Sequence, residues 1–242
     1  MNLEYTQPSV FETVILFVLA LLPAMFLMFL IYKMDKKEKE PVSLLIKLLF
    51  VGVLCAIPAT LLEELAGGLV TMIPGMTTAV YAVISAVYIG IIEEGCKFFA
   101  MHHFTWCDPD FNYRFDGVVY AVFVSLGFAA IENVMYVSLL GLKTAFLRAV
   151  LAVPAHFAFA VYMGSFYGSA KNAEVRGKGS AVKRNLIFAY ITAIVFHALY
   201  DGCLFLNNDL TGILFVALVI LMYIITIVKM RRSAKEDASV FD

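Results

Sequence analysis

The sequence predicts an all-α polytopic membrane protein, a single bundle of about seven transmembrane helices. Of its 242 residues, 62% are hydrophobic and 15% are charged, whereas soluble domains are about 45–50% apolar. The apolar residues form continuous runs long enough to cross a bilayer as helices, without the period-two alternation of β-barrel strands. Spans of about 20 residues leave no room for a separate soluble domain, so residues 1–242 are expected to form one integral-membrane domain.

Seven spans are expected in order along the chain, each justified by one apolar run. Their approximate ranges are 11–32, 42–62, 79–101, 117–140, 146–168, 186–206 and 211–230. The first run has no Lys or Arg before it, so it lacks the basic start of a cleavable signal peptide and is expected to remain as a helix. Pro154 in the fifth run should free a backbone carbonyl and distort that helix near His156. Gly164 and Gly168 have the small-xxx-small spacing of a helix packing contact.

Orientation follows from Lys and Arg, which concentrate in cytoplasmic loops. Lys is abundant in the 33–41 connection, both Lys and Arg are abundant in the 169–185 connection and in the tail from residue 229, and seven spans place all three segments on one side. Only Lys143 and Arg148 dissent. We therefore expect an outside N-terminus, a cytoplasmic C-terminus and a multi-pass location in the cell membrane. The net charge of −1 gives no indication of a nucleic-acid partner, and the lipid bilayer is the expected surrounding.

Three further features are interpreted as unrelated to chemistry. Glu63 and Glu64 follow the second run beside a Gly pair, which favours a solvated helix end at the outer interface. The 102–115 connection contains His, Cys and Asp residues, but a calcium loop that starts at Asp108 would need Gly at the position of Tyr113. We interpret this connection as a hydrated cytoplasmic turn. The four cysteines include no CxxC pair and indicate neither a disulfide framework nor a cysteine zinc site.

A set of ionisable residues lies inside four consecutive expected spans. Each charged residue at bilayer depth costs on the order of 2.5–3.5 kcal/mol on insertion scales, so these side chains are expected to face inward and share a polar interior. The set comprises Glu93, Glu94, Lys97, Glu132, His156, His197 and Asp201.

Spacing along each helix indicates which of these residues meet. Lys97 is four residues from Glu93 and three from Glu94, so its ammonium can reach either carboxylate along one helix face. Adjacent glutamates point about 100° apart, which favours different roles for the two. His197 and Asp201 share a face at i,i+4, the spacing at which a carboxylate orients an imidazole or joins it in binding a metal.

These residue types fit a hydrolytic site. Two histidines and a carboxylate, here His156, His197 and Glu132, match the ligands of hydrolytic zinc sites, so Zn²⁺ is a suspected cofactor. A remaining glutamate, Glu94 or Glu93, can take a proton from water. Taken singly, each residue also has a structural interpretation, such as a Glu93–Lys97 ion pair or a satisfied bundle histidine at His156.

The same residues carry a family resemblance. Residues 93–97 fit EExxK, residues 128–132 fit FxxxE and residues 197–201 fit HxxxD, in an order and helix placement that resemble the PrsW family of intramembrane proteases. The stretch from Asp116 to Asn133 and the segment from His156 to Gly164 resemble it too. The resemblance implies a catalytic core at about residues 79–206. The related CAAX-prenyl and bacteriocin-processing proteases carry His in the second motif, where this chain has Glu132.

The resemblance implies a peptidase that cleaves membrane-anchored proteins, in the best-known case a single-pass anti-sigma factor. Glu93 and Glu94 would supply the water-activating base, with Glu94 preferred and Glu93 held by Lys97. His197 would be a metal ligand or an oxyanion stabiliser. The resemblance leaves open whether the enzyme is a metallo- or a glutamic-type peptidase. Glu132 and His156 would fill the other site positions, Asp201 would orient His197, and the supporting residues would be Lys97, Asp201, Asn133 and Phe128.

Two other functions fit the polar interior. An ion- or proton-coupled carrier also uses Glu, His and Asp relays at depth, although no inverted repeat is evident. A non-catalytic scaffold would use the same side chains to join helices. Depth is a further difficulty for the protease hypothesis, because Glu93 and Glu94 lie nearer the cytoplasmic end of their span and Glu132 nearer the outer end of its own.

Overall fold

The structure, a computed structural model, describes residues 10–241, and their side chains from residue 13 onward. The described chain is almost entirely α-helical, with seven stretches long and apolar enough to cross a membrane, which confirms the predicted fold class. Which side of the membrane each terminus occupies stays a prediction. The helices are α1 (Val10–Met34), α2 (Val42–Thr71), α3 (Thr78–Thr105), α4 (Asp116–Leu140), α5 (Leu142–Val150), α6 (Ala152–Val175), α7 (Gly179–Leu206) and α8 (Asp209–Lys235).

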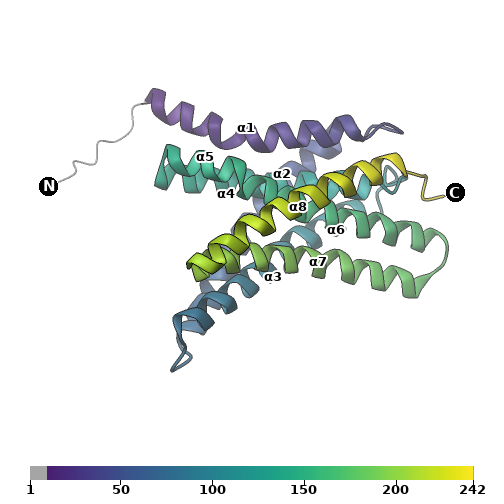
Figure 1. Cartoon of the computed structure of the whole chain (residues 1–242). Coiled ribbons are helices and arrows are strands. Elements are labelled where there is room, and N and C mark those ends of the chain that lie inside the picture. Colours follow the sequence, from purple (N-terminus) through teal and green to yellow (C-terminus); the bar gives the residue numbers. More distant parts are fainter. Residues whose placement is uncertain (1–9, 242) are drawn as a thin grey trace.

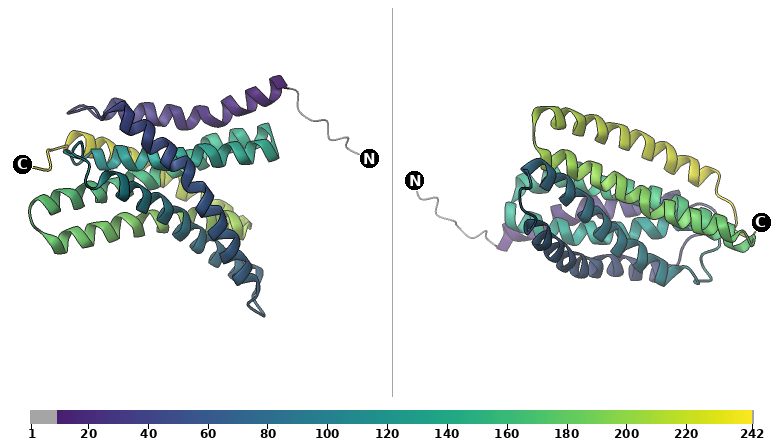
Figure 2. Two further views of the ribbon diagram at one scale, coloured as in Figure 1. Left: turned by 180° about the vertical axis from the view of Figure 1, so that it is seen from behind. Right: turned by 90° about the horizontal axis from the view of Figure 1, so that it is seen from below.

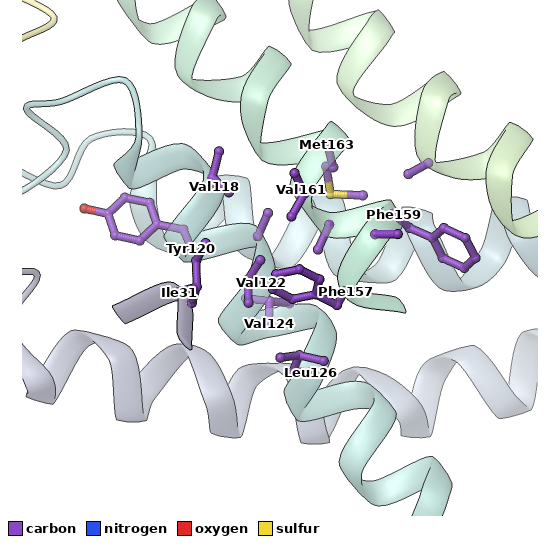
Figure 3. Packing of buried hydrophobic residues seen from close by; sticks show 14 of the residues in the cluster. Ile31, Val118, Tyr120, Val122, Val124, Leu126, Phe157, Phe159, Val161 and Met163 are labelled. Carbon is purple, nitrogen blue, oxygen red and sulfur yellow. The ribbon is translucent and has the colours of Figure 1, made fainter. Parts of the chain in front are cut away.

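Helices α4 and α6 form the centre of the bundle. α4 packs on α1, α2 and α6, and α6 packs on α4, α7 and α8. The hairpin of α2 and α3 crosses the other helices steeply, and its connecting turn projects from the bundle (Figure 1; Figure 2, left). Figure 3 shows the core between α1, α4 and α6, where Ile31, Tyr120 and Val122 lie close to Phe157 and Val161. α4 carries Glu132 and α6 carries His156, two of the predicted site residues.

Glycines let the central helices touch backbone to backbone. A Cβ on Gly164 would lie 2.3 Å from the Gly117 carbonyl oxygen, and one on Gly168 would lie 2.0 Å from the Arg114 carbonyl oxygen. The predicted packing role of Gly164 and Gly168 is therefore confirmed, since no side chain fits between α4 and α6 at these points.

The fifth predicted span is interrupted. α5 ends at Val150 and α6 begins at Ala152, so the break precedes Pro154 by one turn. Proline lacks the N–H that would bond to the carbonyl of Val150. The Tyr223 hydroxyl of α8 donates to that carbonyl instead, at 2.6 Å, and also lies 3.1 Å from the Leu151 carbonyl oxygen. The expected distortion near His156 is therefore present, and α8 stabilises it.

The 102–115 connection differs from the hydrated turn that the sequence predicts. α3 continues to Thr105, and the following loop buries the side chains of Phe111 and Phe115. The Phe111 ring stacks on Tyr167 of α6 with centroids 5.2 Å apart. The C-terminal tail covers the loop, where the N–H of Phe115 donates to Asp237 at 2.9 Å. The polar residues of this segment predict a hydrated turn, but its aromatic side chains are buried and fold the loop back onto the bundle.

Candidate active site

Lys97 lies at the centre of the polar interior. Its ammonium donates to Glu93 Oε2 at 2.9 Å and to Glu94 Oε1 at 2.8 Å. The same nitrogen lies 3.2 Å from His156 Nδ1 and 4.1 Å from the centroid of the Phe128 ring. The side chains of Lys97 and Glu94 are almost completely buried. The ammonium therefore holds both glutamates of α3, not Glu93 alone as the sequence favoured.

Each histidine is held between this centre and an outer carboxylate. His197 Nδ1 lies 2.9 Å from Glu94 Oε1, and its Nε2 lies 3.4 Å from Asp201 Oδ2. His156 has its Nδ1 toward Lys97 and its Nε2 3.0 Å from Glu132 Oε2. The two rings meet edge to face with centroids 5.5 Å apart. In both histidines Nδ1 thus faces the Lys97–Glu94 centre, and Nε2 contacts a carboxylate on the opposite side of the ring.

The depth difficulty disappears in the structure. The imidazole of His156 on α6 bridges Glu132 of α4 and Lys97 of α3, because its two ring nitrogens each contact one of them. Because α3 and α4 cross, residues at different positions along the two helices lie at the same depth in the bundle.

Two residues not predicted for the site complete its surroundings. Arg148 of α5 places Nη2 3.0 Å from Glu132 Oε2 and donates from Nε to Asn133 Oδ1 at 2.9 Å. Asn133 itself lies outside the cavity and donates to the Ala20 carbonyl of α1 at 2.6 Å. Glu63 of α2 lines the same cavity as Glu93 and Glu132, so it is not the solvated helix end that the sequence favoured. Its neighbour Glu64 is exposed.

A cavity of about 660 Å³ opens above the polar centre. Its floor is polar, with Glu93, both site histidines and Asp201 among its lining residues, and Glu94 is not among them. Its walls from α4, α5 and α7 are mainly apolar, with Met135, Leu139, Leu147, Leu204 and Phe205 beside the polar Thr144 and Arg148. A water-accessible carboxylate and imidazole at the foot of an apolar cavity can bind a peptide segment and present water to it.

The donor set also fits a metal ion. One ligand atom from each of Glu93, Glu94, His156 and His197 lies within 4.8 Å of the other three. Imidazole nitrogens and carboxylate oxygens are the zinc ligands of hydrolytic sites, and the outer carboxylates are the partners that orient ligating histidines. Glu94 Oε2 is buried and has no hydrogen-bond partner among the described residues, so it is free to bind a cation. Glu132, which the sequence predicts as a ligand, is outside this group and contacts the far nitrogen of His156 instead.

Fold and site together define a polytopic membrane protein with a buried Glu/His centre of the hydrolase type. Residues 40–228 match the PrsW family of intramembrane metalloproteases, and the chain belongs to that family. It is 30% identical over 230 residues to Protease PrsW of Clostridioides difficile, covering 93% of this chain and 94% of that protein. It is 32% identical over 187 residues to Protease PrsW of Geobacillus kaustophilus, covering 75% and 76%. No solved structure gives a significant match.

Membership confirms the resemblance seen in the motifs and makes the protein a multi-pass membrane protease, not a carrier or a scaffold. The roles of individual residues, the substrate and the identity of the metal are matters for proposal.

Proposed function

We propose that the protein is an endopeptidase that cleaves a single-pass membrane protein at the foot of the 660 Å³ cavity. The observation that carries this proposal is the joining of Glu93, Glu94 and His156 through one buried ammonium, directly below a cavity with apolar walls. Such a floor supplies charged and proton-accepting groups at a depth where water is otherwise excluded.

Glu93 is our candidate for the residue that takes a proton from the attacking water. It lines the cavity, whereas Glu94, which the sequence favoured, has a fully buried side chain. Glu94 instead positions two other groups, because its Oε1 contacts both the Lys97 ammonium and His197 Nδ1. His197, oriented by Asp201 from its other nitrogen, faces the cavity and can stabilise charge on the carbonyl oxygen of the scissile bond.

A metal ion would be held by Glu94, His156 and His197, three of the four residues whose ligand atoms lie within 4.8 Å of one another, which leaves Glu93 free to take the proton, and Zn²⁺ suits this donor set. When bound, zinc supplies Lewis-acid chemistry that polarises a carbonyl and acidifies water. Lys97 donates to Glu94 Oε1, so the ammonium and an ion would share this carboxylate.

The cavity size indicates how the substrate binds. A membrane-spanning helix about 30 Å long and about 10 Å wide occupies roughly 2,400 Å³, several times the cavity volume of about 660 Å³. Only a few residues of a substrate fit, so the scissile segment has to leave its helix before cleavage. A substrate such as a membrane-anchored anti-sigma factor would therefore be cut at a segment that unwinds easily, near Gly or Pro.

Substitutions of single site residues test the catalytic proposal. Glu93→Gln and His197→Ala should leave the protein in the membrane and lower cleavage of a co-expressed single-pass substrate by at least roughly 100-fold, the usual contribution of a general base. Glu64→Gln, a matched change at an exposed glutamate, should cleave at the normal rate. Normal cleavage by both site variants would refute the proposal.

Metal analysis tests the donor set separately. Purified wild-type protein should contain stoichiometric zinc, and His156→Ala and His197→Ala should each lose it, because either substitution removes one of the three proposed ligands. Equal metal content in all three proteins would place any zinc elsewhere.

A further inference from the structure

A second pocket lies at the opposite ends of α4 and α6 from the active-site cavity. It has a volume of about 80 Å³ and is enclosed by the start of α4, the second half of α6 and the last turns of α8. The last turns of α8 lie beside the end of α6 nearest the C-terminus (Figure 1). The proposed catalytic residues are not among its lining residues. Its polar lining consists of Arg114, Lys229, Arg232, Ser165, Ser169, Ser233 and Glu236.

Positive charge in this pocket exceeds negative charge. Three cations face one carboxylate, and Glu236 is paired with Arg232, whose Nε lies 3.0 Å from both of its oxygens. Within the part of the chain that the structure describes, the one hydrogen-bond partner of the Arg114 guanidinium is a hydroxyl group, Ser169 Oγ at 3.3 Å. Lys229 Nζ has no hydrogen-bond or ion-pair partner among residues 13–241, and its one aromatic contact is with Phe166 at 6.0 Å. Among residues 13–241, Arg114 and Lys229 thus form no ion pair, although Asp237 lies near Arg114 and Glu236 near Lys229.

The hydroxyl groups add donors that can turn toward a ligand. Ser165 Oγ donates to the Val161 carbonyl at 2.7 Å, and Ser169 Oγ donates to the Ser165 carbonyl at 2.8 Å. Ser233 Oγ lies 3.5 Å from Ser165 Oγ. A hydroxyl proton rotates freely about its C–O bond, so each can be redirected into the pocket without movement of the backbone.

Topology alone does not account for this arrangement. Basic residues collect at cytoplasmic helix ends in every membrane protein, and exposed Arg231 on the same turn of α8 is such a residue. Arg114, Lys229 and Arg232 differ because two distant segments of the chain bring them to one concave site with hydroxyl groups. Like charges repel, so such convergence is favourable when an anion occupies the site.

We propose that this pocket binds a phosphate group, carried by the headgroup of an anionic phospholipid or by inorganic phosphate. Phosphate offers several acceptor oxygens, which guanidinium and ammonium groups bind with short charge-assisted hydrogen bonds. Basic pockets between helices at the cytoplasmic side of membrane proteins bind phospholipid headgroups in this way. A bound phosphate joins the end of α8 to α6 and to the start of α4.

Ligand-dependent thermal stability of the purified full-length protein tests this proposal. Phosphatidylglycerol in mixed micelles should raise the melting temperature of the wild type relative to the same amount of phosphatidylcholine. Lys229→Gln and Arg114→Gln should each need roughly fivefold more phosphatidylglycerol for the same rise, the usual contribution of one basic residue at an anionic surface. Arg231→Gln, with the same loss of charge outside the pocket, should respond as the wild type does.

Inorganic phosphate at matched ionic strength distinguishes the two sources. Protection of the wild type but not of Lys229→Gln by phosphate alone identifies the free ion as a ligand, whereas protection by the lipid alone identifies the headgroup. A response that Lys229→Gln, Arg114→Gln and Arg231→Gln lose to the same extent, or no response of the wild type to either ligand, overturns the proposal. Arg114 is exposed and outside the helices, so its variant tests the site if Lys229→Gln does not fold.

Discussion

At the scale of single residues, Lys97 explains how four polar groups that are costly to bury, its own ammonium and the side chains of Glu93, Glu94 and His156, coexist in this membrane domain. Its ammonium contacts two carboxylates and an imidazole and lies over an aromatic ring. Removing one member of a buried charge pair typically costs 3–5 kcal/mol, since the partner is left uncompensated. Lys97 therefore matters for folding as well as for any chemistry of Glu93 and Glu94.

Lys97→Met should lower the free energy of unfolding by about 3 kcal/mol or more, measured by denaturant titration in detergent. Lys97→Met combined with Glu94→Gln should recover part of that loss, because the double variant buries one charge fewer. Lys183→Met, at an exposed lysine of α7, serves as the control and should be near neutral. A double variant less stable than Lys97→Met would contradict this account.

Much of the site was predictable at this scale, and the two residues missed have identifiable causes. Motif spacing predicted that Lys97 meets Glu93 and Glu94 and that His197 meets Asp201, because both contacts are within one helix. The Gly pair that follows Glu63 and Glu64 favours a solvated helix end, although α2 continues through it to Thr71. With Ala56 and Thr60, Glu63 lines the cavity from one face of α2, at helical spacing. Arg148 looked like a loop cation and lies on α5.

At the scale of elements, the position of the site depends on how closely the helices approach. A Cβ on Gly52 of α2 would lie 2.0 Å from the Val124 carbonyl oxygen, and one on Gly127 of α4 would lie 2.2 Å from the Leu49 carbonyl oxygen. These contacts, with Gly164 against Gly117, set the spacing between α2, α4 and α6. Spacing patterns identify candidate glycines, but only the packed structure shows which partner helix each one meets.

Gly164→Ala should destabilise the protein strongly, because the added methyl group meets backbone atoms at 2.3–2.8 Å and forces α4 and α6 apart. Gly68→Ala is the matched control, since a Cβ there has no atom within 4 Å. It should be neutral or slightly stabilising, as alanine favours helix over glycine. Yields of folded protein by size-exclusion chromatography and melting temperatures compare the two variants. Equal stability would mean that this contact does not fix the helix spacing.

At the scale of the whole molecule, the end of the bundle that carries the C-terminus is closed by buried carboxyl groups outside the spans. Burial raises the pKa of Asp35 to about 6 against the lowering effect of Lys39, and burial also raises the pKa of Glu40. The Glu40 carboxylate accepts a hydrogen bond from Tyr120 at 2.8 Å. Asp237 of the tail, whose pKa burial likewise raises, adds to the negative charge near Asp35.

These groups bind protons more tightly in the folded than in the unfolded protein, so stability should fall as pH rises. For Asp35 the loss extends from about pH 4 to about 6 and amounts to at most on the order of 3 kcal/mol. Asp35→Asn should flatten the pH profile of the melting temperature in that range, and Glu40→Gln should flatten it at higher pH. Glu64→Gln, at an exposed glutamate of α2, should leave the profile unchanged. A wild-type protein that becomes more stable from pH 4 to 6 would contradict this assignment.

The sequence predicts the number of spans well because insertion into lipid requires continuous apolar runs. It does not predict how the 106–115 loop, the tail and the carboxyl cluster meet, since those contacts join residues far apart in the sequence, such as Phe115 and Asp237 or Glu40 and Tyr120.

The cavity above Lys97 also bears on the supply of a reactant. Hydrolysis consumes one water molecule per bond, and the hydrocarbon core around the bundle contains almost none. At about 30 Å³ per molecule of liquid water, a volume of about 660 Å³ holds on the order of twenty molecules beside Glu93. Filled with water, the cavity would be a local reservoir of solvent. Successive turnovers would then depend on how quickly that reservoir refills after each product leaves, as well as on the barrier to bond cleavage.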